Sequence, residues 1–156
     1  MFENSFGPES KLWVFQSAEE FNGEEVSRAL LSFFENWQTH GRKVESASSV
    51  IEGRFLVVAV NELYHSVSGC AIDELTKAVN KVGSTKNLNL IDRGGFYIKV
   101  GDELRYVKFT DFKDLYTQGE IHDHAEFYDA SISVNREFSK RWVSRIGDSW
   151  MKNRFL

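Results

Sequence analysis

The chain has 156 residues, which fits one domain, and its 42% apolar and 27% charged residues are typical of a globular protein. A formal net charge of -4, from 19 basic and 23 acidic residues, does not favour nucleic acid or an anionic membrane surface as a partner. The single cysteine, Cys70, excludes an internal disulfide and a cluster of thiolate metal ligands. The first ten residues do not resemble a signal peptide, and the longest apolar run, residues 55–60, is too short to cross a membrane. We therefore expect a cytoplasmic protein.

The beginning of the chain predicts a flexible segment followed by folded structure. Residues 1–10 are expected to form a flexible N-terminus, and residues 11–156 a single α+β domain. The apolar run at residues 12–15 predicts the first strand.

The most regular pattern in the sequence predicts a helix after Asn22. Asn22 and Glu25 have the spacing of a capping box, and Gly41 is expected to end the helix as a left-handed cap. The apolar positions recur three and four residues apart, as required for one buried stripe. They are Val26, Ala29, Leu30, Phe33, Phe34 and Trp37.

The next segment alternates between strand and helix patterns. Residues 44–51 are polar and rich in serine, which predicts an edge strand, whereas residues 55–60 are all apolar and predict a strand buried on both faces. A second helix is expected at residues 71–82, ended by Gly83, and residues 88–91 predict another short strand.

This order, strand–helix–strand–strand–helix–strand, matches the split βαβ or ferredoxin-like layout. In that layout the first and third strands are central and the others lie at the edges. The continuously apolar runs are the first and third, so the hydrophobic pattern agrees with the topology. We therefore expect an antiparallel sheet with two helices on one face.

The last fifty residues predict a hairpin-and-helix extension of this core. Residues 96–100 and 104–109 flank a turn at Gly101-Asp102, and a short helix is expected at residues 111–118. A final helix is expected from Asn135 until Gly147 interrupts it. The residues expected to pack beyond it as a separate terminal turn are Trp150, Met151 and Phe155.

Seven segments spread over most of the chain carry a resemblance to a known family: FFENWQTHG, RFLVVAVNE, SGCAIDELTKAVN, DRGGFY, FKDLYTQGEI, FYDASI and DSWM. They resemble a family of small bacterial proteins often catalogued as "ABC transporter ATPase", for which no activity is established. A P-loop requires the pattern G-x-x-x-x-G-K-[ST] to hold phosphates and magnesium. The sequence contains no such pattern, so we reject ATP hydrolysis as the function.

Cys70 and His65 are the candidate catalytic residues. Cys70 lies where a loop leads into the helix at residues 71–82, and backbone N–H groups at a helix start stabilise a thiolate. His65 lies on the preceding loop and could serve as the base of a Cys–His pair. The alternative is structural: free cysteine is often a small core residue, and Asp73 puts negative charge near the thiol.

The same loop predicts an anion or ligand site at Ser68, Gly69 and Ala71. The N–H groups at a helix start can hold a phosphate or carboxylate. A serine in front of a helix also serves as an ordinary N-cap, and that alternative stays open.

Two further segments contain residue types that occur in binding sites. His122-Asp123-His124 could place two imidazoles on one side of a strand, but this short pattern is common in polar loops, and no metal is predicted. Trp142 and Trp150 lie among basic residues and are the candidate partner-binding residues. The alternative is an amphipathic helix with its tryptophans inside.

Because no catalytic constellation is recognisable, the first functional hypothesis is a non-catalytic binding or adaptor protein with a protein partner. The alternative is a small thiol-dependent enzyme or an anion-binding protein that uses the Ser68–Cys70 loop. No cofactor is expected. The composition is compatible with a homodimer and does not favour membrane or nucleic-acid binding.

Overall fold

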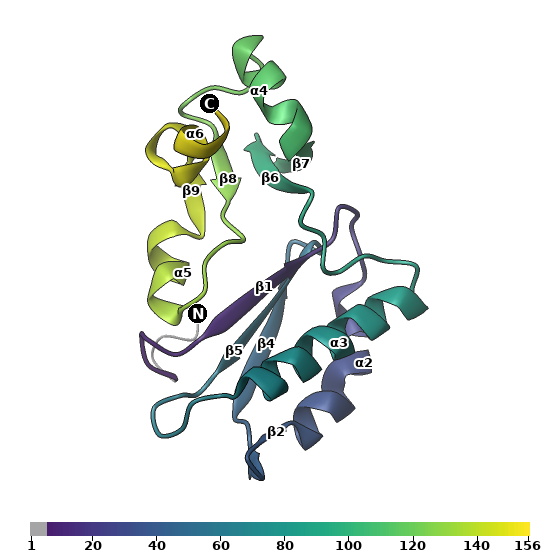
Figure 1. Ribbon diagram of the computed structural model, residues 1–156. Helices are drawn as coiled ribbons and strands as arrows, with labels where there is room; N and C mark the ends of the chain where they lie inside the picture. Colours follow the sequence, from purple (N-terminus) through teal and green to yellow (C-terminus); the bar gives the residue numbers. More distant parts are fainter. Residues whose placement is uncertain (1–5) are drawn as a thin grey trace. The chain divides into compact units, whose positions relative to one another are not determined.

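The computed structural model describes residues 6–156, and they form two compact units (Figure 1). Unit 1 contains the chain up to Asp92 together with Ile132–Ser139. Unit 2 contains Arg93–Ser131 and Lys140–Leu156. The chain thus passes between the units three times. A single domain over residues 11–156 requires that the two units fold together, and this stays a prediction.

A three-stranded antiparallel sheet is the centre of unit 1. Its strands are β1 (Leu12–Gln16), β4 (Ser46–Ile51) and β5 (Phe55–Val60), in the order β1-β5-β4. All six side chains of β5 are fully buried, as its unbroken apolar run predicts. Strand β4 pairs only with β5 among the described residues, and it is therefore an edge strand, as predicted.

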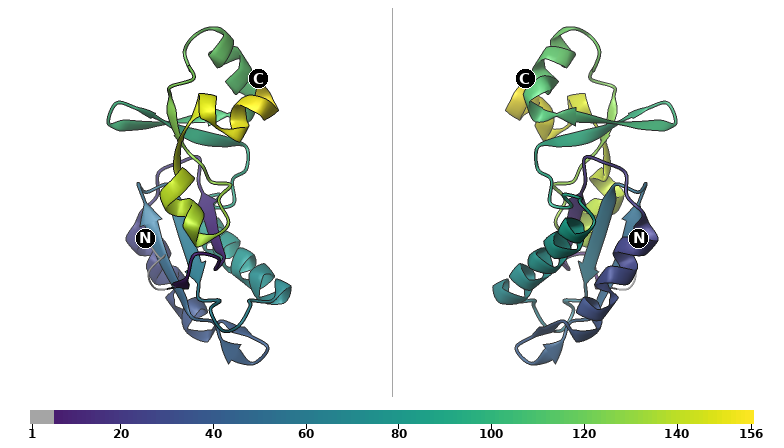
Figure 2. Two further views of the ribbon diagram at one scale, coloured as in Figure 1. Left: turned by 90° about the vertical axis from the view of Figure 1, so that its left-hand side faces the viewer. Right: turned by 90° about the vertical axis from the view of Figure 1, so that its right-hand side faces the viewer.

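Two helices cover one face of this sheet (Figure 2, right). Helix α2 (Gly23–Asn36) begins at Asn22, whose side chain accepts hydrogen bonds from the N–H groups of Glu24 and Glu25. Helix α3 (Gly69–Thr85) runs beside it. The residues through which the helices bury their apolar stripes are Val26, Leu30, Ala71, Leu75 and Val79.

Helix α2 ends at Asn36, before the end predicted at Gly41, because Trp37 leaves the helix for the core. Trp37 has extended backbone angles, is 1% exposed, and donates from its ring N–H to the carbonyl of Ala71 at 2.9 Å. The chain then forms a hairpin of β2 (Gln38–Thr39) and β3 (Arg42–Lys43). The predicted cap, Gly41, instead occupies the left-handed position of the hairpin turn, with φ 75°.

The strand predicted at residues 88–91 does not form. Only Ile91 makes an isolated bridge, parallel to Gln16. The chain turns tightly after α3, since the Leu88 N–H donates back to the carbonyl of Gly83 at 2.9 Å, and the Ile91 N–H donates to the Asn89 side chain at 3.1 Å. The apolar side chains of this segment instead pack in the core, where Leu90 is fully buried.

A four-stranded antiparallel sheet organises unit 2, in the order β7-β6-β8-β9. Its strands are β6 (Gly95–Val100), β7 (Glu103–Lys108), β8 (Glu126–Tyr128) and β9 (Val143–Arg145). The helical elements are α4 (Phe109–Thr117), the 3-10 turn Ile146–Asp148 and α6 (Trp150–Phe155). The hairpin, the short helix and the terminal turn predicted after residue 96 are thus all present. Aromatic rings dominate the core: Phe96 contacts Phe112 and Phe127 edge to face.

The final helix predicted from Asn135 to Gly147 is shorter in the structure. Helix α5 (Asn135–Arg141) stops before Trp142, and the following residues form β9 instead. The reason is strand pairing: the Asp129 N–H donates to the carbonyl of Trp142 at 2.8 Å, and β9 pairs antiparallel with β8. The buried ring of Trp142 anchors the point where helix changes to strand.

The described part of the predicted flexible N-terminus, residues 6–10, is packed in unit 1. Phe6 and Ser10 are buried, and the Ser10 hydroxyl donates to the carbonyl of Phe6. Residues 1–5 lie outside the described part. Helices and antiparallel sheets together give the α+β class that was predicted. No helix within residues 6–156 is long and apolar enough to cross a membrane.

Candidate functional site

The outer edge of strand β4 offers backbone groups for pairing. The Asn61 N–H donates to the carbonyl of Glu45 at 2.8 Å, so the groups of Glu45 point toward β5. Because hydrogen-bonded and non-hydrogen-bonded pairs alternate in an antiparallel ladder, the N–H and C=O groups of Ser46, Ser48 and Val50 point away from β5. The strand itself, SASSVI, contains no charged residue and no proline, the usual devices that protect an edge.

Helix α2 runs beside this edge, and the side chains of α2 nearest to Val50 are small. Gly23 lies so close to Val50 that an added Cβ would be 3.0 Å from the valine Cβ. Ser27 follows four residues later on the same stripe of the helix, and Leu31 four after that. Leu31 is 56% exposed, the largest exposure of an apolar side chain on α2. The helix therefore has small residues at the hollow beside Val50, and Leu31 is an exposed leucine further along it.

Two separate open hollows lie beside α2 and β4, one toward each end of the strand. One, of about 450 Å³, is lined by Phe34 and Glu35 of α2 and by residues 43–46. The other, of about 460 Å³, is lined by residues 22–24 and Ser27 of the helix side and by Val50 and Gly53 of the strand side. We use the name α2/β4 groove for these two hollows together with the edge of β4 between them. Its backbone edge, two hollows and exposed leucine are the features of a site for an extended peptide.

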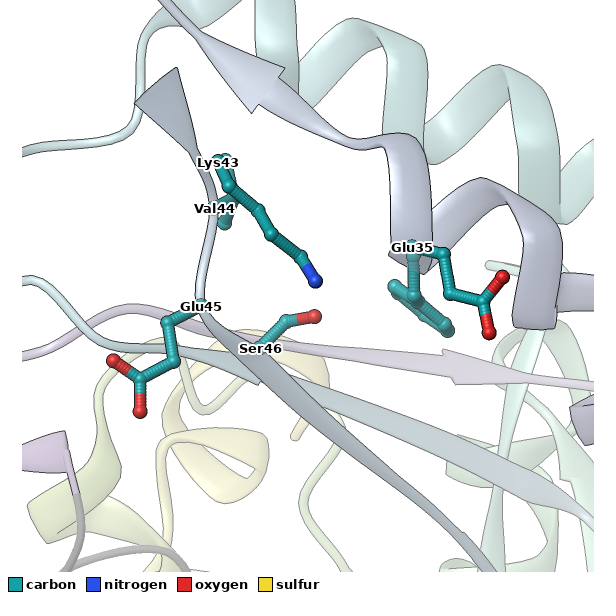
Figure 3. A pocket seen from close by; sticks show the side chains of 6 residues that line it. Glu35, Lys43, Val44, Glu45 and Ser46 are labelled. Atoms are coloured by element: carbon teal, nitrogen blue, oxygen red, sulfur yellow. The ribbon is translucent and has the colours of Figure 1, made fainter.

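Lys43 enters the hollow at the start of β4 (Figure 3). Its amine points toward the side of the hollow where the Ser46 hydroxyl lies, whereas the carboxyl groups of Glu35 and Glu45 point away. Glu45 instead accepts a hydrogen bond from the Asn61 side chain at 2.9 Å. Among residues 6–156 no carboxylate lies within ion-pair distance of the Lys43 amine. The lining of this hollow thus contains one amine and two carboxylates, and the two carboxylates are directed away from the amine.

The two candidate catalytic residues have different surroundings in the structure. Cys70 is exposed, as a reactive thiol requires. The ring nitrogens of His65, however, lie against the guanidinium of Arg42 on β3, with Nδ1 at 3.2 Å from the Arg42 nitrogen. Within the described chain no hydrogen bond joins His65 to Cys70. The imidazole of His65 therefore contacts the guanidinium of Arg42, and its role as the base for this thiol stays a prediction.

The candidate anion site is an N-cap in the structure. The Ser68 hydroxyl accepts a hydrogen bond from the Ala71 N–H at 3.2 Å, and the Ser68 N–H donates to the Thr39 hydroxyl at 3.0 Å. Gly69 is exposed and opens the helix. The N–H of Ala71, one of the groups expected to hold an anion, is therefore already bonded within the protein.

The candidate partner-binding tryptophans have little exposed surface. Trp142 is 7% exposed and packs against Tyr128 with ring centres 5.1 Å apart. Trp150 is half-buried, and its ring N–H donates to the buried carboxylate of Asp129 at 3.1 Å. Both rings therefore stabilise unit 2, which matches the structural alternative considered for them.

The segment around His122 and His124 contains a polar cluster that the sequence did not predict. Asp123 accepts hydrogen bonds from the Tyr116 hydroxyl at 2.7 Å and from the Lys152 amine at 3.1 Å. The hydrogen bond from Tyr116, together with that from Lys152, lowers the pKa of Asp123, and its carboxylate raises the pKa values of Tyr116 and Lys152. Within residues 6–156 no group of three or more His, Cys, Asp or Glu side chains is placed to hold a metal ion.

The α2/β4 groove was not predicted as a site, although part of its signal is visible in the sequence. The prediction of an edge strand at residues 44–51 was made, but the outward direction of particular N–H groups follows only from the register with β5. No family model, curated protein or solved structure matches this chain, so the resemblance to small bacterial proteins stays a prediction.

Proposed function

We propose that this protein is a non-catalytic binding protein that takes an extended segment of a protein partner into the α2/β4 groove. The observation that carries the proposal is the open, uncharged edge of β4 beneath the small residues of α2. A partner segment adds to the sheet as a fourth strand beside β4. Binding by strand addition takes its affinity from backbone hydrogen bonds and its specificity from the alternate side chains.

Each part of the groove has a role in this mode of binding. The outward N–H and C=O groups of Ser46, Ser48 and Val50 supply the hydrogen bonds to the added strand. Alternate side chains of the partner point toward α2, where Leu31 offers apolar contact and the two hollows accept side chains. Carboxylates of Glu24 and Glu35 line the helix side of the hollows, which favours basic residues in the partner away from Lys43.

The first test replaces Ser48 by proline. Proline is tolerated on an edge strand where the N–H points outward, so Ser48→Pro removes a donor to the partner while leaving the ladder with β5 in place. We expect peptides of eight to ten residues, selected from a random display library on the wild-type protein and then synthesised, to bind Ser48→Pro at least about tenfold more weakly. Titration calorimetry measures the affinities, and NMR shifts locate the bound peptide.

Leu31→Lys is the second variant, since it removes apolar contact from the helix side without changing the strand. It should weaken the same peptides, while Leu63→Lys, another exposed leucine of unit 1, should not. Circular dichroism and thermal unfolding confirm that each variant is folded. Peptides whose shifts fall outside the groove, or a library that yields no binder, would overturn the proposal. A wild-type chain that dimerises through a Ser48→Pro-sensitive contact would replace the peptide partner by a second copy.

The exposed Cys70 thiol supports a second candidate function, in which the protein is a small thiol-dependent enzyme or binds an anion. The observation in its favour is the exposure of Cys70 at the start of α3, next to Ser68 and Gly69. The contact of His65 with Arg42 counts against it. We expect the native Cys70 thiol to be alkylated no faster than the thiol of the unfolded chain. Faster reaction of the native thiol at neutral pH, measured with iodoacetamide, would support the enzyme instead.

The ferredoxin-like layout of unit 1 and a cytoplasmic location are also part of this proposal. We propose that unit 1 derives from the ferredoxin-like layout with its fourth strand reduced to the bridge at Ile91. The order β1-β5-β4 and two helices on one face support this. A cytoplasmic setting suits a protein whose one cysteine is an exposed free thiol.

A further inference from the structure

We propose that the α2/β4 groove takes the free C-terminus of a partner protein, with the terminal carboxylate beside Lys43 and Ser46. This inference rests on the proposed function and names the kind of segment that binds. Three groups at the start of β4 can bind a carboxylate: the Lys43 amine, the Ser46 hydroxyl and the outward N–H of Ser46. Figure 3 shows the lysine amine and the serine side chain at the same hollow, with the nearby carboxyl groups directed elsewhere.

The position of the Lys43 amine also favours one direction of the added strand. Strand β4 runs from Ser46 to Ile51, so a strand that pairs with it antiparallel ends beside Ser46. A strand that paired parallel would begin there and place its amino terminus, or its incoming chain, at the Lys43 amine. The lysine attracts the carboxylate and repels an amino terminus. An antiparallel C-terminal segment is therefore the occupant that fits the charge.

The surrounding side chains define what the last residues of such a segment contact. Phe34 is half-buried and lines the hollow at Lys43 together with the buried Val44, so the final side chain finds the ring of Phe34 there. Leu31 lies one turn of helix before Phe34 and Glu35, about 5 Å along the groove. Side chains two residues apart in a strand are about 7 Å apart, so the third-last side chain reaches Leu31. Glu24, at the far hollow, favours a basic residue upstream.

The charge at Lys43 is tested with pairs of peptides that differ only at the terminus. Peptides of eight residues are selected from a library displayed with free C-termini, and each is synthesised as the free acid and as the C-terminal amide. We expect the amide to bind wild-type protein at least tenfold more weakly than the acid. Lys43→Gln should remove the difference between acid and amide. Arg42→Gln is the matched control, since Arg42 is the neighbouring cation but lies against His65, and it should preserve the difference.

The outcomes separate the two proposals. Equal binding of acid and amide, with both sensitive to Ser48→Pro, would overturn the carboxylate inference and leave strand addition standing. A difference that survives Lys43→Gln would overturn the assignment of the carboxylate to Lys43. If no peptide of either form binds, the proposed function itself fails. Lys43 is exposed, so unfolding of Lys43→Gln is not expected, and thermal unfolding of the variant checks this.

Discussion

At the scale of single residues, Asp123 links three segments of unit 2. It accepts hydrogen bonds from Tyr116 of α4 and Lys152 of α6, and its own carbonyl accepts from the Gly147 N–H at 2.9 Å. Gly147 is required by close packing, since an added Cβ would lie 2.7 Å from the Asp123 Cβ. In the sequence, Asp123 stands out only as part of the His122-Asp123-His124 pattern. The structure gives it a structural role, in which it holds the terminal helix α6 against α4.

This cluster predicts how the stability of the protein depends on pH. The pKa of Asp123 is lowered, so its contribution to stability is present above its unfolded pKa of about 3.9 and is lost as the pH falls through the lower folded value. The pKa values of Tyr116 and Lys152 are raised, so their contribution is present below about 10 and is lost as the pH rises through the folded values. The cluster is therefore expected to stabilise the protein most between about pH 5 and pH 9.

The measurement is the free energy of unfolding of wild type and Asp123→Asn in urea at several pH values. The variant should be less stable at pH 7, and the difference should shrink below pH 4 and above pH 10. Asp114→Asn on the exposed surface of α4 is the control and should show no such profile. A difference between wild type and Asp123→Asn that stays constant from pH 3 to pH 11 would contradict the prediction.

At the scale of elements, the helices and buried strands could be predicted because their patterns are local. The apolar stripe of α2, the unbroken run of β5 and the cap at Asn22 are visible within short windows of sequence, and all three are present in the structure. The ends of elements were predicted less well because distant residues determine them. Trp37 leaves its helix to donate to Ala71, and Trp142 leaves α5 as β9 pairs with β8.

The candidate site shows the same limit more strongly. Serine-rich polarity at residues 44–51 predicted an edge strand, but the groove depends on which helix runs beside that edge. It also depends on the register, which directs the groups of Ser48 outward, and on the tight approach of Gly23 to Val50. None of these follows from periodicity. The residues singled out for chemical reasons, Cys70 and His65, were chosen by type, and no local pattern shows that Arg42 contacts the histidine ring.

At the scale of the whole molecule, the path of the chain predicts how the two units unfold. Each unit has its own apolar cluster, centred on β5 in unit 1 and on Phe112 and Phe127 in unit 2. Yet Ile132–Ser139 belongs to unit 1, where the Leu12 N–H donates to the carbonyl of Ser133 at 3.0 Å. Residues 93–131 of unit 2 thus lie in sequence between the two segments of unit 1. We therefore expect the units to unfold together, as the single domain predicted for residues 11–156 requires.

Native-state hydrogen exchange followed by NMR tests this without any substitution. The slowest-exchanging amides are expected in β5, represented by Val58, and in unit 2, represented by Phe112 and Phe127. If the units unfold together, the free energies of opening of these amides agree with one another and with the free energy of unfolding in urea. A lower common value for the amides of unit 2 would show that this unit opens while unit 1 stays folded. The chain would then contain two domains, and the α2/β4 groove would belong to a domain that holds its fold without β6 to β9.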